Sequence, residues 1–239
     1  MNEPLDTISI ERLAISFIPV FIVLYILFRW SLNSKTALYA VSRMLAQLTL
    51  AGYFLKYLFE AQNWYIVLAS LCVMVSVSSW ISLRTIAKNR TRLYIHTFGA
   101  ILIGGGSTLM LVTQAVLNLE PWFYPRYMII LGGMIFSSSM NCVSLAADRF
   151  FKELQKGSNY NNARNEALKT ALIPITNTLF AVGLITFPGM MAGQIISGVD
   201  PFIAIRYQIM VMCMVYASAG LSSALFLVFV KKSREEITN

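Results

Sequence analysis

The chain has little charge. Only 13% of its 239 residues are Asp, Glu, Lys or Arg, against roughly 25% in soluble domains. Its largest polar segment, Asp148 to Lys169, is too short to build a hydrophobic core of its own. With 57% apolar residues and a mean hydropathy of +0.64, this composition excludes a soluble globular protein. The apolar runs are continuous rather than alternating as in a β-barrel, and they predict an all-α membrane protein.

Motifs for nucleotide binding and for hydrolytic chemistry are also absent from the sequence. No G-x-x-x-x-G-K-[ST] loop occurs, so we expect this chain to bind no ATP and no other cofactor itself. The single histidine, His96, has no H-E-x-x-H partner, and no nucleophile-and-base pattern indicates a protease. We therefore expect a protein that is not an enzyme, and no metal ligands can be assigned. The cysteines all fall within apolar segments and predict buried thiols rather than disulfides: Cys72, Cys142 and Cys213.

Seven segments are apolar enough to cross a bilayer, whose hydrocarbon core of ~30 Å takes about 20 residues per helix. They are predicted at 10–30, 36–59, 64–83, 94–119, 124–147, 170–195 and 202–230. The sequence thus predicts a polytopic bundle of about seven transmembrane helices, forming a single transmembrane domain over residues 1–239. The first segment is not a cleavable signal peptide, because its flank MNEPLDTISIER is acidic and no A-x-A-like site follows it.

Lysine and arginine are distributed unevenly over the connections between these segments. With the N-terminus outside, 14 of the 19 cations lie on the inner side and four on the outer side. Because inner loops of membrane proteins carry the excess of cations, we expect the N-terminus out and the C-terminus in, in the inner (plasma) membrane. The net charge of +8 is then mostly this bias, and no nucleic-acid partner is expected.

Polar side chains and helix breakers lie inside three of the predicted spans. In the second, Arg43 and Gln47 share a face, and Arg43 either snorkels to the headgroups or has a structural or pathway role. In the sixth, Pro188 removes a backbone donor and should kink or break the helix near Phe187. One face of the fifth carries a polar stripe that suits close packing or a conduit: Gly133, Ser137, Asn141, Ser144 and Asp148.

Residues beside the expected break have two open interpretations. Gly189 and Gly193 form a small-xxx-small step that lets another helix approach. Thioethers suit soft metals, so we interpret the neighbouring methionines as packing or lipid-facing residues, with a site role as the alternative. Across the three spans, the candidates for the transport pathway or its gate are Arg43, Gln47, Asn141, Pro188, Gly189, Met190, Met191, Gly193 and Gln194.

Three motifs at 171–210 resemble the signature of the Fet-type iron-export ABC permease family, which includes plant permeases that confer aluminium resistance. They are P-I-x-N at 174–177, P-G-M-M-x-G-Q at 188–194 and D-P-x-x-A-x-x-Y-Q-I at 200–209. The resemblance extends over about 40–60 and 126–230, although Ser138 and Ser139 stand where the family usually has Gly-Asn. It implies the membrane half of an ABC exporter: a permease homodimer that exports iron or another metal, with ATP bound by a separate ATPase subunit.

The same resemblance implies a docking element for the ATPase. ABC permeases commonly dock a short helix with an acidic-Ala element, and Glu166-Ala167 is such an element in the connection at 148–169. The candidates for coupling are therefore Asp148, Arg149, Arg164, Glu166 and Lys169. A plain solvated loop is the alternative for this segment. Two other functions stay open: a stand-alone channel or secondary transporter, and an ABC permease for an organic cargo such as a nucleotide-sugar.

Overall fold

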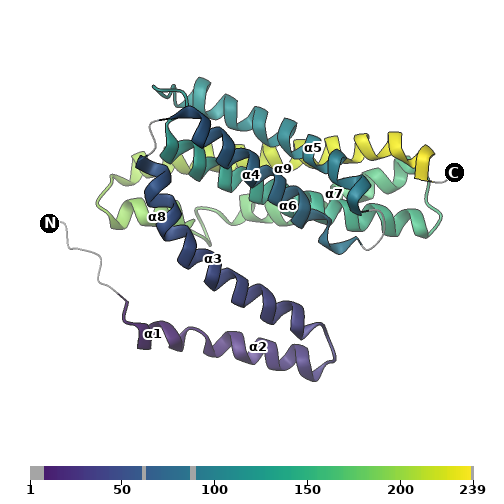
Figure 1. Cartoon of the computed structure of the whole chain (residues 1–239), viewed down its shortest axis with the longest axis horizontal. Helices are drawn as coiled ribbons and strands as arrows, with labels where there is room; N and C mark the ends of the chain where they lie inside the picture. Colours follow the sequence, from purple (N-terminus) through teal and green to yellow (C-terminus); the bar gives the residue numbers. More distant parts are fainter. Residues whose placement is uncertain (1–7, 61–62, 87–89, 238–239) are drawn as a thin grey trace. The chain divides into compact units, whose positions relative to one another are not determined.

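The structure is a computed structural model that describes residues 8–60, 63–86 and 90–237 (Figure 1). The predicted all-α class is confirmed: within these ranges the elements are helical, and the only extended contact is an isolated bridge between Val182 and Thr186. The chain divides into two compact units, residues 1–60 and 61–239, which are described separately. Lys88, the acidic residues 1–7 and the side chains of Lys232 and Arg234 lie outside what the structure describes.

The first unit contains three helices. α1 (Ile10–Ile15) and α2 (Ile18–Arg29) follow each other within one apolar stretch of 20 residues. The Ser9 hydroxyl accepts the N–H of Arg12 at 3.4 Å and caps α1. Pro19 lies in the first turn of α2, where its missing N–H has no helical partner to lose. α3 (Ser34–Glu60) is one continuous helix of 27 residues.

The second unit, residues 61–239, is a helical bundle built around its last helix. α4 (Trp64–Ser82) leads through the 3₁₀ turn η1 (Leu83–Thr85) to α5 (Arg90–Met110), which continues as the π-helix η2 (Leu111–Val116). α6 (Pro125–Gln155), α7 (Tyr160–Ala181), α8 (Gly189–Ile196) and α9 (Pro201–Ile237) follow. Figure 1 shows α4, α5, α6 and α9 running alongside one another. α9 packs against α5, α6, α7 and α8 and so reaches most of the unit.

Five helical segments among the described residues are long and apolar enough to cross a membrane. These candidate spans coincide with the segments predicted at 10–30, 64–83, 94–119, 124–147 and 202–230, and they are Ile10–Arg29, Trp64–Ser82, Arg90–Val116, Pro125–Gln155 and Pro201–Lys231. The predicted second span is also a helix, α3, but its residues are less apolar on average than those of α2. α3 is therefore not among the segments that are apolar enough to cross a membrane. The predicted sixth span is not a single helix. A seven-span topology therefore stays a prediction for these two segments.

The tightest helix contact lies between α5 and α9. A Cβ atom on Gly104 would lie 2.7 Å from the backbone nitrogen of Ser222, so only glycine allows this approach. The Ser222 hydroxyl donates to Ser139 Oγ of α6 at 3.1 Å, and Ser139 donates to the carbonyl of Ser218 at 3.2 Å. In the GGGS sequence at 104–107, Gly104 thus allows close helix packing, whereas Gly106 has no atom within 4 Å of such a Cβ.

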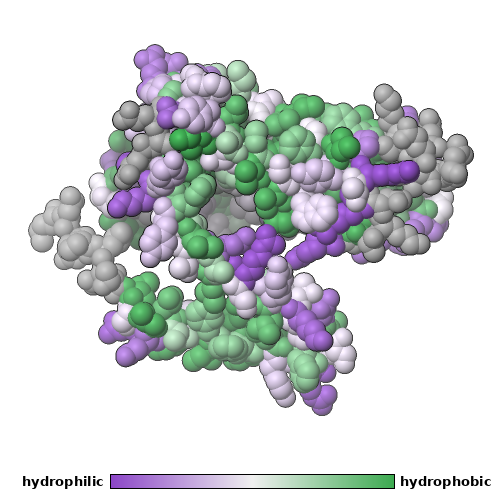
Figure 2. Space-filling model, in the orientation of Figure 1, coloured by the Kyte–Doolittle hydropathy of each residue, from purple (hydrophilic) through white to green (hydrophobic). Residues whose placement is uncertain are grey.

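Apolar side chains cover the outside of the bundle as well as its interior. Ile95, Met110 and Phe202 are exposed by 73%, 69% and 76%. Figure 2 shows hydrophobic side chains across much of the visible surface. A soluble protein would bury most of these groups, so the exposed side chains are those expected to meet lipid. The structure therefore supports a membrane protein independently of hydropathy.

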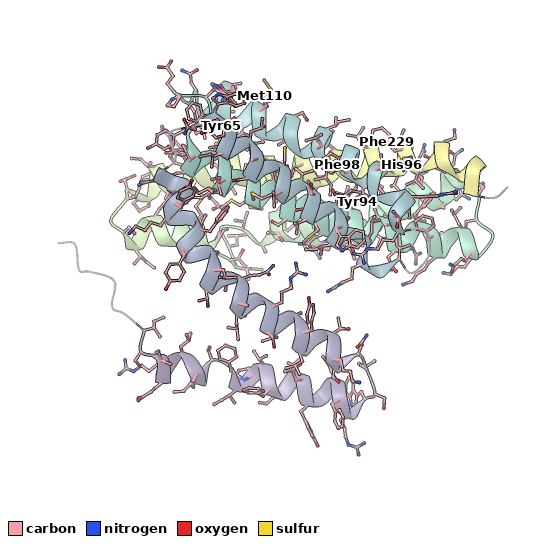
Figure 3. All side chains as sticks on the ribbon, viewed as in Figure 1. Tyr65, Tyr94, His96, Phe98, Met110 and Phe229 are labelled. Carbon is pink, nitrogen blue, oxygen red and sulfur yellow. The ribbon has the colours of Figure 1, made fainter. Side chains whose placement is uncertain are left out.

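Most of the described cations of the second unit lie at one end of its helices, whereas Arg126 and Arg206 lie near the starts of α6 and α9. Arg90 Cζ lies 3.9 Å from the centre of the Trp80 ring, which joins the start of α5 to the end of α4. The Tyr160 hydroxyl donates to the carbonyl of Leu227 at 2.9 Å, which joins the start of α7 to the last part of α9. Figure 3 labels Tyr94, His96 and Phe98 of α5 and Phe229 of α9 at this end. The end holds Arg84, Arg90, Arg92, Arg149, Lys152, Lys156, Arg164, Lys169 and Lys231.

The contact at Gly104 predicts a strong difference between two neighbouring glycines. Gly104→Ala should destabilise the bundle by about 1–3 kcal/mol, because the new methyl group would overlap the backbone of α9. Gly106→Ala should be neutral or slightly stabilising, since its methyl group meets open space and alanine favours the helix. Thermal unfolding of the purified variants in one detergent measures both effects. Equal melting temperatures for the two variants would contradict the close approach of α5 and α9.

Candidate functional site

The segment predicted as the sixth span is broken between Ala181 and Gly189. The N–H groups of Leu184, Ile185 and Thr186 all donate to the carbonyl of Ala181, at 3.3, 2.8 and 3.1 Å. Gly183 adopts a φ of +85°, which glycine tolerates without strain, and its N–H donates to Thr186 O at 3.0 Å. Because the loop pairs these donors within itself, it can lie in apolar surroundings without water.

The expected break near Phe187 is confirmed, but the role given to Pro188 is not. Pro188 is the N-cap residue of α8, with φ −59° and ψ 146°. No helical turn precedes it, so its ring has nothing to kink. The proline inside a helix is Pro174 of α7. Ala171 is fully buried, whereas Pro174 and Thr178, one and two turns further along the same side, are exposed. α7 is therefore less buried after Ala171, although Ile175 still packs against the core.

α8 and α9 form a helical hairpin that is closed by a tight turn. Gly198 ends α8 with a φ of +87°, and the N–H of Val199 donates back to the carbonyl of Gln194 at 3.0 Å. Asp200 begins α9: its Oδ1 accepts the N–H of Phe202 at 2.8 Å. The Asp-Pro dipeptide noted in the sequence is therefore a turn that caps the following helix. Figure 1 shows α8 beside the beginning of α9.

The candidate residues of α8 lie in different surroundings. Met191 is buried, with 7% of its surface exposed. Met190 lines a cavity of about 300 Å³ together with Tyr127 and Leu131 of α6. At Gly189 and Gly193 an added Cβ would meet no atom of the described chain within 4 Å. The small-xxx-small step therefore packs against no helix among the residues that the structure describes.

Two glutamines of the α8–α9 hairpin carry buried oxygen atoms that lack a partner. Gln194 Oε1 is buried and accepts no hydrogen bond. Gln208 of α9 is only 5% exposed, and its Oε1 also lacks a donor. Sequence analysis did not select Gln208, although it lies in the D-P-x-x-A-x-x-Y-Q-I motif. The signal that could have identified it is an amide inside an otherwise apolar span.

The polar stripe of α6 is not the surface through which this helix packs. Asn141 and Ser137 are exposed. The contacts with α9 come from the next positions: the Ser138 hydroxyl donates to Val215 O at 3.3 Å, and Ser139 bonds α9 as described above. Cys142 Sγ contacts the carbonyl of Ala171 in α7 at 3.3 Å. Packing within the chain therefore does not account for Asn141.

Arg43 and Gln47 lie four residues apart on α3, in the first unit. The predicted shared face is thus present, and Gln47 is exposed on it. Their closeness to the residues of α8 stays a prediction, as does the choice between snorkelling and a pathway role for Arg43.

Residues 148–169 form the tip of a helical hairpin instead of a loop with a separate short helix. α6 continues to Gln155 and α7 begins at Tyr160. Between them Gly157 takes a φ of +86°, and the Asn159 side chain accepts the N–H of Asn162 at 2.9 Å to cap α7. Glycine and the N-cap asparagine were visible in the sequence, but the continuation of both helices into the polar segment was not expected.

The five coupling candidates are distributed along this hairpin. Asp148 pairs with Lys152 at 2.7 Å, and Arg149 pairs with Glu153 at 3.1 Å, both along one helix face. Glu166 is exposed. The Arg164 side chain donates to Asn165 Oδ1 at 2.9 and 3.1 Å, and Lys169 is exposed as well.

The acidic-Ala element is divided between two sides of α7. Ala167 is fully buried, and so are Ala163 and Ala171 one turn before and after it. These alanines form the seam along which α7 packs into the bundle. Only Glu166 of the pair is available to a partner. Among the residues that the structure describes, no three His, Cys, Asp or Glu side chains are grouped as a metal site would require.

Comparison with known proteins identifies relatives along almost the whole chain. Residues 10–234 match the model of the family described as "Uncharacterised protein family (UPF0014)". The chain is 31% identical to the "Probable iron export permease protein FetB" of Escherichia coli (strain K12), over 90% of this chain and 88% of that protein. It is 30% identical to the "UPF0014 membrane protein slr1647" of Synechocystis, over 78% of each chain.

A plant protein is similar as well. The chain is 29% identical to "Protein ALUMINUM SENSITIVE 3" of Arabidopsis thaliana, over 78% of this chain and 72% of that protein. No solved structure matches the chain. The extent of the family match and the identity to the bacterial relatives confirm the resemblance seen in the three motifs at 171–210. The chain belongs to the UPF0014 family of membrane proteins.

Proposed function

We propose that the chain is the membrane permease subunit of an ABC exporter that moves iron or another metal and is driven by a separate ATP-binding subunit. The observation that carries this proposal is the similarity to the probable iron export permease of Escherichia coli along nearly the whole of both chains. The helical bundle with apolar outer faces and the absence of a nucleotide-binding motif in the sequence support the same assignment.

The α6–α7 hairpin tip is the proposed docking element for the ATPase. Its exposed side carries Glu166 and Lys169, and its inner side is the buried alanine seam. The Tyr160 hydroxyl also holds the base of α7 against α9 through Leu227. A partner that pushes on this tip would therefore move α7 and α9 together, since neither can shift without disturbing the seam.

A second copy of the chain is the proposed partner within the membrane. In the broken segment Leu184 and Ile185 are exposed by 87% and 80%, and Ile196 of α8 by 71%. Gly193 lies on the same short helix with open space before it. A symmetric contact through this glycine would bury the break between two copies, away from lipid.

Charge exchange on the hairpin tests the docking of the ATPase. Arg164→Glu combined with Glu166→Lys keeps the net charge and leaves the alanine seam intact, but presents the wrong charges to a partner. We expect the yield of ATPase that co-purifies with the permease to fall about tenfold, equivalent to about 1.4 kcal/mol. Efflux of loaded Fe²⁺ from vesicles that contain both subunits should fall with it.

Arg206→Glu, at the other end of the unit, is the matched control and should leave co-purification unchanged. Normal efflux and normal co-purification in the hairpin variant would move the docking surface elsewhere. If vesicles with the unaltered chain and the ATPase show no ATP-dependent Fe²⁺ efflux, iron export itself is refuted.

Gly193→Leu tests the homodimer. Because an added side chain meets no atom of its own chain, the monomer should keep its melting temperature. A dimer built through α8 should dissociate, since leucine prevents close approach. Gly106→Leu has equally open space on α5 and should stay dimeric. The mass of each variant in detergent, measured by light scattering, distinguishes the two results, and a Gly193→Leu dimer would exclude this interface.

The orientation is proposed to be N-terminus out and C-terminus in, with the cation-rich end in the cytoplasm. In a chain whose cysteines are replaced, Asn161→Cys at the hairpin tip should react with a membrane-impermeant thiol reagent only after the membrane is opened. Ser197→Cys, exposed in the turn between α8 and α9, should react in intact cells. The reverse pattern would invert the topology.

A further inference from the structure

The packed helices provide no hydrogen-bond donor for the side-chain oxygen of Gln208. Gln208 lies within the candidate span Pro201–Lys231 and is 5% exposed. Its Oε1 has no hydrogen-bond donor. Burying an amide oxygen without a donor destabilises a protein, and a leucine of similar size would remove that cost. An unpaired amide in this position therefore indicates that something outside the described atoms supplies a donor.

The neighbours of Gln208 place it where three helices meet. The adjacent Tyr207 interacts with Tyr127 near the start of α6. Tyr127 in turn lines the cavity of about 300 Å³ that also contains Met190 of α8 and Arg126. Ala204, one turn before Gln208 on the same face of α9, is fully buried. Gln208 thus lies on the inner side of α9 at the level of this cavity.

Gln194 brings a second amide to the same hairpin. α8 and α9 are joined by the turn at 197–200. Gln208 follows this turn by as many residues as Gly189 precedes it, so the two lie at the same height in the hairpin. Gln194 is five residues from Gly189 along α8. Five residues of helix rise about 7.5 Å along the axis, so the two amides lie less than two turns apart along the hairpin. Both oxygens are acceptors without donors, so both call for the same kind of ligand.

We propose that Gln208 and Gln194 line a hydrated site at this end of the bundle, where water donates hydrogen bonds to the two amide oxygens. The water is present either alone or as the hydration shell of the transported solute. A buried water needs two to four polar partners, and two glutamines provide the first of them. Small divalent cations give up their water reluctantly, so a cation can pass such a site with its shell intact. The shell would also screen it from the charge of Arg126.

Replacement of Gln208 by leucine distinguishes a hydrated site from an ordinary packing position. Gln208→Leu should lower the melting temperature by about 2–4 °C, because the hydrogen bonds between the amide and water are lost. It should lower ATP-dependent Fe²⁺ efflux at least tenfold. Ser223→Ala is the matched control on the same helix: Ser223 is fully buried and its Oγ also lacks a partner, but it lies four turns further along α9. That variant should transport normally.

Thiol labelling gives a readout that does not depend on transport. In a chain without other cysteines, Gln208→Cys should react with a small water-soluble methanethiosulfonate, and Ser223→Cys should not. No reaction at position 208, or a higher melting temperature in Gln208→Leu, would overturn the hydrated site. The labelling result holds whether or not the exporter assignment is correct, and only the efflux measurement rests on the proposed function.

Ferrous ion distinguishes the two sources of water. Under anaerobic conditions Fe²⁺ should raise the melting temperature of the unaltered chain but not of Gln208→Leu if the water belongs to the cargo. Equal shifts in both chains, with position 208 still labelled, identify water alone. Normal efflux in Gln208→Leu would overturn the role of the site in transport.

Discussion

The rest of the second unit depends on the close contact of α5 with α9. At Gly104 the two backbones approach so closely that a methyl group would not fit. The Ser222 hydroxyl extends this contact to Ser139 of α6. In a bilayer, apolar burial gives helices little reason to associate, so small residues and interhelical hydrogen bonds determine how they pack. Because α9 also packs against α7 and α8, this contact positions both the hairpin tip and the break.

Hydropathy predicted the five helical segments that are long and apolar enough to cross a membrane. It failed at 170–195, because Leu184 and Ile185 are as apolar as helix residues but lie in a loop. That loop forms because three N–H groups share the carbonyl of Ala181, a pattern that no local propensity reveals. Pro188 did mark the break, whose end it forms. It could not show that Pro174, by contrast, lies inside a continuous helix.

Spacing predicted which residues share a face but not which face turns inward. The stripe through Asn141 was correctly identified on α6, yet Ser138 and Ser139 make the contacts with α9. Which side of a helix is buried depends on its neighbours, and these lie up to 83 residues away in the sequence. The same limit hid Gln208, since its lack of a donor is a property of the packed bundle.

In the proposed exporter, one helix, α7, connects the hairpin tip that would dock the ATPase with the break that follows Ala181. α7 runs without interruption from Tyr160 at the hairpin tip to Ala181 at the break, about 33 Å at 1.5 Å per residue. Its first part is fixed by the alanine seam, and beyond Ala171 none of its residues is fully buried. A push on the tip would therefore tilt the less buried part. The loop that follows can absorb this tilt, because its donors are paired within the loop and move with it.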